Sequence, residues 1–108
     1  MEKTIYRFEF IEGTNPEEIE DTIGLSIIAA GCLLGEPAVR LDFGYTVGPS
    51  RSTGKPCAVL AYHGEAGAIT TRIFVGFASH EYGNDSFRCL RISEANADAD
   101  DIEDKHLK

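Results

Sequence analysis

The side chains best able to bind a metal or to act as nucleophiles are spread thinly along the chain: Cys32, Cys57, His63, His80 and Cys89. None of the short spacings typical of zinc sites, such as C-x-x-C or H-E-x-x-H, occurs among them. If the last three strands form consecutive hairpins, Cys57 lies opposite Phe74 and Cys89 opposite Ser79, too far apart for a shared metal or a disulfide. We therefore expect reduced thiols, no metal centre and no cofactor.

Two short runs contain residue types used in nucleophilic and acid–base catalysis. In Ser79-His80-Glu81, neighbouring side chains on a strand would point to opposite faces and could not form a hydrogen-bonded triad. His63 and Glu65 are expected at a hairpin tip, where polar residues are ordinary. The sequence thus favours a protein that is not an enzyme.

The most distinctive polar segment covers residues 48–56, with the sequence GPSRSTGKP. It is not a phosphate loop, because five residues separate Gly48 from Gly54, Lys55 is followed by proline, and a strand rather than a helix is expected next. It could still bind a carboxylate or phosphate, or an acidic partner, and the candidate residues are Arg51, Ser52, Thr53 and Lys55. The alternative is a solvated hairpin loop without a ligand.

The elements that would position these residues begin with a strand and a helix. Tyr6, Phe8 and Phe10 alternate with polar residues over 4–12, which predicts a strand with one aromatic face. An N-cap at Thr14 or Asn15, a proline at position 16 and several acids in the first turns predict a helix that ends at Gly35.

Four later segments are rich in β-branched or aromatic residues and predict strands at 38–47, 56–63, 68–80 and 87–92. Turns at 64–67 and 83–85 would join the last three strands as a meander. The resulting order is β-α-β-β-β-β. It predicts a single α+β domain over residues 3–93, with one helix packed on one face of a mostly antiparallel sheet of about five strands.

The second half of the predicted helix is apolar around its whole circumference. Such a helix must be covered on both sides, so we predict a homo-oligomer interface, with the candidate residues Leu25, Ile28, Cys32 and Leu33. The second face of the sheet is not cleanly polar either and is a further candidate. The apolar residues considered for it are Ile5, Ile11, Ala58, Leu60, Tyr62 and Phe74. Alternatively, the 48–56 loop or the C-terminal tail folds back over these residues.

Charge and length narrow the possible partners and the location. The 108 residues carry a formal net charge of −8, which disfavours direct nucleic-acid binding. The longest apolar run, 23–34, is shorter than the roughly 20 residues that cross a membrane. With no secretory leader and an odd number of cysteines, the expected location is cytoplasmic.

Residues 94–108, with six acids and two lysines, are expected to be a disordered acidic tail.

Three functions are compatible with these features. The leading hypothesis is a small acidic protein–protein interaction domain that is not an enzyme and that self-associates. The second is a small-anion or metabolite-binding protein, or an accessory enzyme subunit, that uses the 48–56 loop. The third is an inhibitor that imitates nucleic acid to block a DNA-binding protein.

Overall fold

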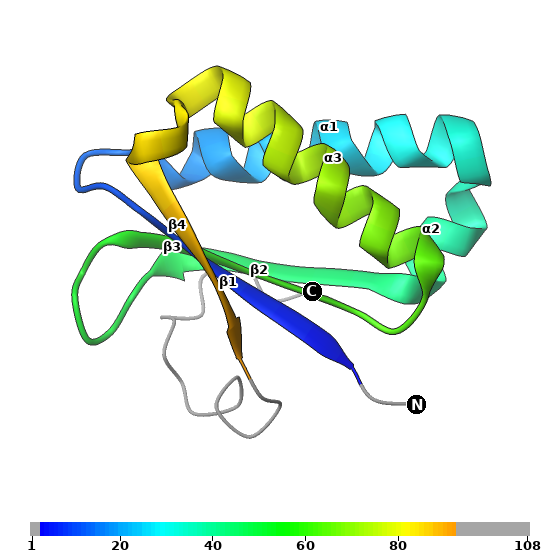
Figure 1. The fold of residues 1–108 in the computed structure, drawn as a ribbon, viewed down its shortest axis with the longest axis horizontal. Coiled ribbons are helices and arrows are strands. Elements are labelled where there is room, and N and C mark those ends of the chain that lie inside the picture. Colours follow the sequence, from blue (N-terminus) through cyan, green and yellow to red (C-terminus); the bar gives the residue numbers. More distant parts are fainter. Residues whose placement is uncertain (1–2, 93–108) are drawn as a thin grey trace.

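The computed structural model describes residues 3–92. One face of its four-stranded antiparallel sheet is covered by two long helices, α1 (Pro16–Leu34) and α3 (Glu65–Tyr82) (Figure 1). The strands are β1 (Thr4–Phe10), β2 (Phe43–Pro49), β3 (Pro56–Tyr62) and β4 (Phe87–Ile92), in the order β2-β3-β1-β4. A short helix α2 (Glu36–Asp42) follows α1, and a 3₁₀ turn, η1 (Asn84–Ser86), precedes β4. Without α2 and η1, this is the β-α-β-β-α-β topology of ferredoxin-like folds.

The expected α+β class is confirmed, and so is the first helix. Asn15 is the N-cap, and its side-chain oxygen accepts a hydrogen bond of 2.9 Å from the backbone N–H of Glu17. The helix ends at Leu34, and Gly35 follows with a φ of 93°, a conformation that glycine adopts without strain. The described residues differ from the prediction in having three α-helices and four strands.

The strand predicted at 68–80 is wrong, because this segment is the centre of α3. Its β-branched residues satisfied the composition of a strand, but its buried residues follow the helical spacing: Gly67, Thr70, Thr71, Phe74 and Ala78. The hydroxyls of Thr70 and Thr71 donate to the backbone carbonyls four residues earlier. Tertiary burial on the sheet therefore overrides the intrinsic β-propensity of these side chains.

The two turns predicted on either side of that segment are wrong for the same reason. The glycines of 64–67 open α3, with Gly64 at the N-cap. Gly83 closes α3 at the C-cap, and the 3₁₀ turn follows before β4. Glycine occurs at helix ends as well as in hairpin turns. The last three predicted strands are therefore a strand, a helix and a strand (β3, α3 and β4) rather than a meander.

The strand predicted at 38–47 is half wrong. Residues 36–42 form α2, and β2 begins only at Phe43. Within α2, Val39 is buried while Leu41 is 88% exposed, whereas residues two apart in a strand would lie on the same face. The strands predicted at 4–12, 56–63 and 87–92 are present, the first two with slightly earlier ends.

The core lies between the helices and the sheet. Phe8 of β1 meets Phe74 of α3 edge to face, with ring centroids 5.1 Å apart. Phe10 meets Tyr82 in the same way at 5.5 Å. Aliphatic side chains complete this layer: Ile19, Ile23, Val47 and Leu60. The aromatic face predicted for the first strand is therefore the face that the helices cover.

The strand register also changes the expected positions of the cysteines. Cys57 pairs with Glu9 and Cys89 with Phe8, so both flank β1 on neighbouring strands instead of lying far apart. Side chains opposite adjacent residues point to opposite faces, so Cys89 lies on the helix side and Cys57 on the uncovered side of the sheet, here called the far face. Cys57 is buried, whereas Cys32 and Cys89 are exposed.

Candidate functional site

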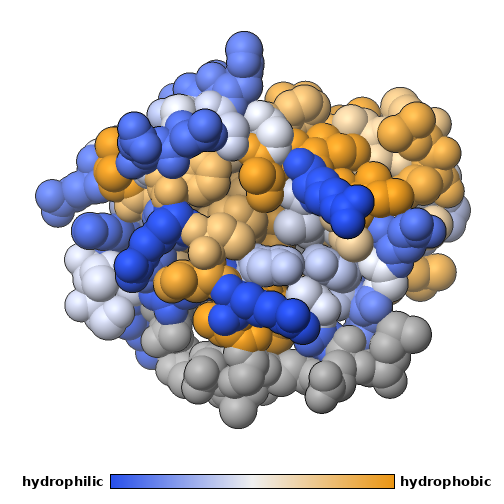
Figure 2. Space-filling model, viewed as in Figure 1, coloured by the Kyte–Doolittle hydropathy of each residue, from blue (hydrophilic) through white to orange (hydrophobic). Residues whose placement is uncertain are grey.

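Large exposed hydrophobic side chains are concentrated on the helices. Among residues 3–92, six of the eight belong to the helices: Leu25, Ile28, Leu33 and Leu34 of α1, Leu41 of α2 and Phe77 of α3. Figure 2 shows the hydrophobic residues gathered over the end of the helical layer where α1 meets α2. Apolar side chains clustered in this way mark contact surfaces more often than single exposed ones do.

The sequence-predicted interface residues form one part of this surface. Leu25, Ile28 and Cys32 follow each other at intervals of three and four positions, which places them on one side of α1. The exposed fractions are 58% for Leu25, 63% for Ile28 and 76% for Leu33, and Cys32 is also exposed. We call these four residues the apolar face of α1. Residues 24–35 contain no charged side chain, so charge does not interrupt this face.

The far face of the sheet has a different character, because a charged cluster lies on it. Arg7 is only 6% exposed and donates a hydrogen bond of 2.8 Å to the hydroxyl of Ser50. Glu9 lies 3.3 Å from Arg7 and 2.9 Å from Arg88. Leu90 is 39% exposed on the same face. Of the residues expected on this second face, Ile5 is there, but Ala58, Leu60 and Tyr62 alternate onto the helix side and Phe74 belongs to α3.

The 48–56 segment connects β2 and β3 as a hairpin, as predicted: its ends are paired strand residues, and residues 50–55 form the loop. The candidate residues Arg51, Ser52, Thr53 and Lys55 are all exposed on this loop. Two of its hydroxyls are used within the loop itself. The Thr53 hydroxyl accepts from the Lys55 backbone N–H at 3.2 Å, and the Ser52 hydroxyl lies 3.1 Å from that of Ser50. Because these hydroxyls are already hydrogen-bonded, the charges of Arg51 and Lys55 would be the main source of attraction for an anion. Anion binding by this loop stays a prediction.

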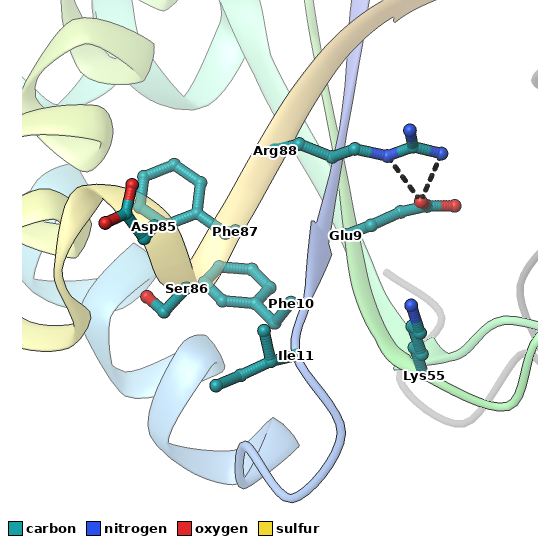
Figure 3. Close-up of a pocket in the computed structure, with 8 residues that line it drawn as sticks. All are labelled: Glu9, Phe10, Ile11, Lys55, Asp85, Ser86, Phe87 and Arg88. Carbon is teal, nitrogen blue, oxygen red and sulfur yellow. Dashed lines mark hydrogen bonds and ion pairs between the residues drawn. The ribbon is translucent and has the colours of Figure 1, made fainter.

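Lys55 lines a shallow cavity of about 170 Å³ at the end of β1, together with Glu9, Asp85 and Arg88 (Figure 3). Glu9 and Arg88 point toward one another there, and both the Nε and Nη2 atoms of Arg88 lie 2.9 Å from one Glu9 oxygen. The two carboxylates offset the two basic groups, so the cavity has no net attraction for an anion.

The part of the chain that the structure describes offers neither a cluster of metal ligands nor a membrane-spanning helix. No group of three or more His, Cys, Asp or Glu side chains there could hold a metal ion. None of its helices has both the length and the apolar character needed to span a membrane. The acidic tail at 94–108 lies outside the described residues.

Asp42, which belongs to no recognisable sequence motif, joins the end of α2 to the start of α3. One carboxylate oxygen accepts from the backbone N–H groups of His63 and Gly64 at 2.9 and 2.7 Å. The other accepts from the N–H of Gly67 at 2.6 Å. A carboxylate placed here satisfies amides that the first turn of a helix leaves unpaired and lies at the positive end of its dipole.

The same contacts determine how Asp42 titrates. Partial burial disfavours the charged form, but the backbone N–H groups of Gly67, His63 and Gly64 and the nearby His63 side chain outweigh it and lower the pKa of Asp42. A lowered pKa in the folded state means that ionised Asp42 stabilises the fold at every pH above its unfolded value of 3.8. That contribution is lost as the pH falls through the folded pKa.

We therefore expect acid to erase the advantage of Asp42 over an uncharged residue. The free energy of unfolding of the wild type should exceed that of Asp42→Asn at neutral pH, and the difference should shrink on acidification from about pH 5 to about pH 2. Urea denaturation at several pH values measures it. A difference that stays constant over this range would show that the charge of Asp42 does not contribute.

Comparison with protein families, curated proteins and solved structures found no match to this chain. The ferredoxin-like topology alone transfers no function, because many unrelated activities share it. The features of this chain that bear on its function are therefore its exposed surfaces, above all the apolar face of α1.

Proposed function

We propose that this protein is an interaction domain that is not an enzyme and that self-associates through the apolar face of α1. The observation that carries the proposal is the placement of the large exposed hydrophobic side chains. Leu25, Ile28 and Leu33 are each more than half exposed on one helix. Covering such side chains contributes about 25 cal/mol for each Å² of apolar surface removed from water.

A second copy of the chain fits this face better than a charged partner does. The first half of α1 carries Glu17, Glu18, Glu20 and Asp21, and the second half carries no charge. In a twofold dimer the same patch meets itself. An axis near Ile28 would bring the two uncharged halves together and leave the acidic halves at the rim, where water still solvates them.

The proposal predicts a dimer that one charge disrupts. Ile28→Glu would place two carboxylates near the axis, without partners and removed from water, and should raise the dissociation constant by at least about 30-fold. Because Ile28 is 63% exposed, the substitution should leave the monomer folded. Light scattering after size exclusion, at tens of micromolar, measures the mass, and circular dichroism checks the fold.

Leu90→Glu is the matched control, since Leu90 is an exposed leucine on the far face of the sheet. It should leave the dimer intact. A wild-type chain that is monomeric at these concentrations contradicts self-association. If Leu90→Glu dissociates the assembly and Ile28→Glu does not, the interface lies on the sheet instead.

A further inference from the structure

A groove of about 310 Å³ lies beside α3, on the helix side of the sheet. The rings of Tyr6 and Phe8 line it from β1, and Tyr62 lines it from the neighbouring strand β3. Val75 and Arg72 line it from α3, and Cys89 lines it from β4. The volume is at the lower end of the range of about 300–1,000 Å³ found for small-molecule sites.

The groove is open because the helices do not cover the sheet evenly. The backbones of α1 and α3 approach the sheet mainly at β2 and β3, whereas β4 is the edge strand beyond β1. Cys89 and Arg91 alternate onto the helix side of β4 and are nevertheless exposed. The helix side of this edge is therefore accessible to a ligand.

Two arginines lie near the tyrosines of the groove. Arg72 lines it from α3, and Arg91 of β4 is the strand partner of Tyr6 on the helix side of the sheet. The rings of Tyr6 and Tyr62 are stacked with centroids 6.4 Å apart. Burial raises the pKa of Tyr62, the neighbouring Tyr6 hydroxyl raises it further, and the positive charges of Arg91 and Arg72 oppose the rise. The Tyr62 hydroxyl is therefore in contact with Tyr6, and the two guanidinium groups lie near enough to affect its pKa.

We propose that this groove binds a small organic monocarboxylate whose body is a single aromatic ring or a branched aliphatic chain. Val75 and the tyrosine rings supply apolar contact for the body, over the buried ring of Phe8. Arg72 and Arg91 supply the positive charge that complements a carboxylate, and arginine pairs with carboxylates through two parallel hydrogen bonds. The volume suits one ring and is too small for a dinucleotide. Binding here does not require self-association, because the residues involved are not those of the apolar face of α1.

Benzoate is a suitable probe, and the backbone amide spectrum of the ¹⁵N-labelled full chain is the readout. Saturable shifts are expected at residues of β1, β4 and α3 that line the groove, with roughly millimolar affinity for so small a ligand. Arg72→Gln combined with Arg91→Gln should weaken binding about tenfold or more, because two charged hydrogen-bond donors are lost. Both side chains are exposed, so the double variant should fold, and its melting temperature checks this.

Arg51→Gln is the matched control, because Arg51 is an exposed arginine in the β2–β3 loop. It should leave benzoate affinity unchanged. Benzyl alcohol, a neutral analogue, should bind at least about tenfold more weakly than benzoate. Equal affinity for the two probes, the absence of saturable shifts, or shifts confined to residues 48–56 would each overturn the proposal.

The cysteines provide an independent measurement. Cys89 lines the groove, whereas Cys32 is exposed on α1 and serves as the internal reference in the Ile28→Glu variant, in which the proposed dimer does not cover it. Saturating benzoate should slow alkylation of Cys89 by iodoacetamide while leaving the rate at Cys32 unchanged, as followed by peptide mass spectrometry. If the ratio of the two rates is the same with and without benzoate, the ligand does not occupy the groove.

Discussion

Replacing Gly67 with alanine is expected to lower the free energy of unfolding by about 3 kcal/mol, at the upper end of the cost of overpacking. A Cβ atom at this position would overlap the Cβ of Tyr62 and lie 3.0 Å from the backbone oxygen of Asp42. Neither atom is the end of a flexible side chain, so relief requires α3 to move away from β3. Urea denaturation followed by circular dichroism measures the loss.

Gly76→Ala is the matched control in the same helix. Nothing lies within 4 Å of a Cβ at Gly76, and the residue is exposed. Alanine there should stabilise the protein by about 0.5–1 kcal/mol, because glycine is a poor helix former. Similar effects of the two substitutions would contradict the close approach of α3 to the end of β3.

Replacing Asp42 with alanine is expected to lower the free energy of unfolding by about 2–3 kcal/mol. Hydrogen bonds to charged groups contribute about 1.5–3 kcal/mol each when well buried, and partial exposure of this carboxylate reduces that contribution. Alanine would leave the amides of His63, Gly64 and Gly67 without their carboxylate acceptor. Denaturation gives the total loss, and amide hydrogen exchange at Gly64 and Gly67 shows whether it is local.

Asp21→Ala is the control for the general effect of removing an acid, because Asp21 is exposed on α1. It should change stability by no more than about 0.5 kcal/mol. Exchange at Gly64 and Gly67 should be unaffected by it. If Asp42→Ala is as mild as Asp21→Ala, the carboxylate does not hold the start of α3.

Both positions matter for the proposed ligand groove, because they fix the start of α3. Gly67 and Asp42 determine how closely the first turn of this helix approaches β3 and the end of α2. Arg72 and Val75 lie farther along the same helix and line the groove. The displacement of α3 that Gly67→Ala requires should therefore weaken benzoate binding, even though Gly67 does not line the groove.

The first helix, the first strand and the β2–β3 loop were predictable because their signals are local. A cap at Asn15, Pro16 and a glycine at 35 fix the ends of α1 without reference to the rest of the chain. The exposed hydrophobic residues of α1 follow from the same periodicity. The predicted interface residues are therefore correctly placed on a helix surface, while their role in association stays a prediction.

The sequence alone thus determined the α+β class and the aromatic face of the first strand. It also determined the first helix, whose second half is apolar even on the side exposed to solvent. Only the tertiary structure decided that residues 65–82 form a helix, because burial of Thr70, Phe74 and Ala78 on the sheet outweighs the β-propensity of their neighbours. It also decided which strands are adjacent, since pairing β1 between β3 and β4 depends on contacts between residues far apart in the chain. The groove beside α3 and the role of Asp42 follow from those long-range contacts, and no local pattern could have indicated either.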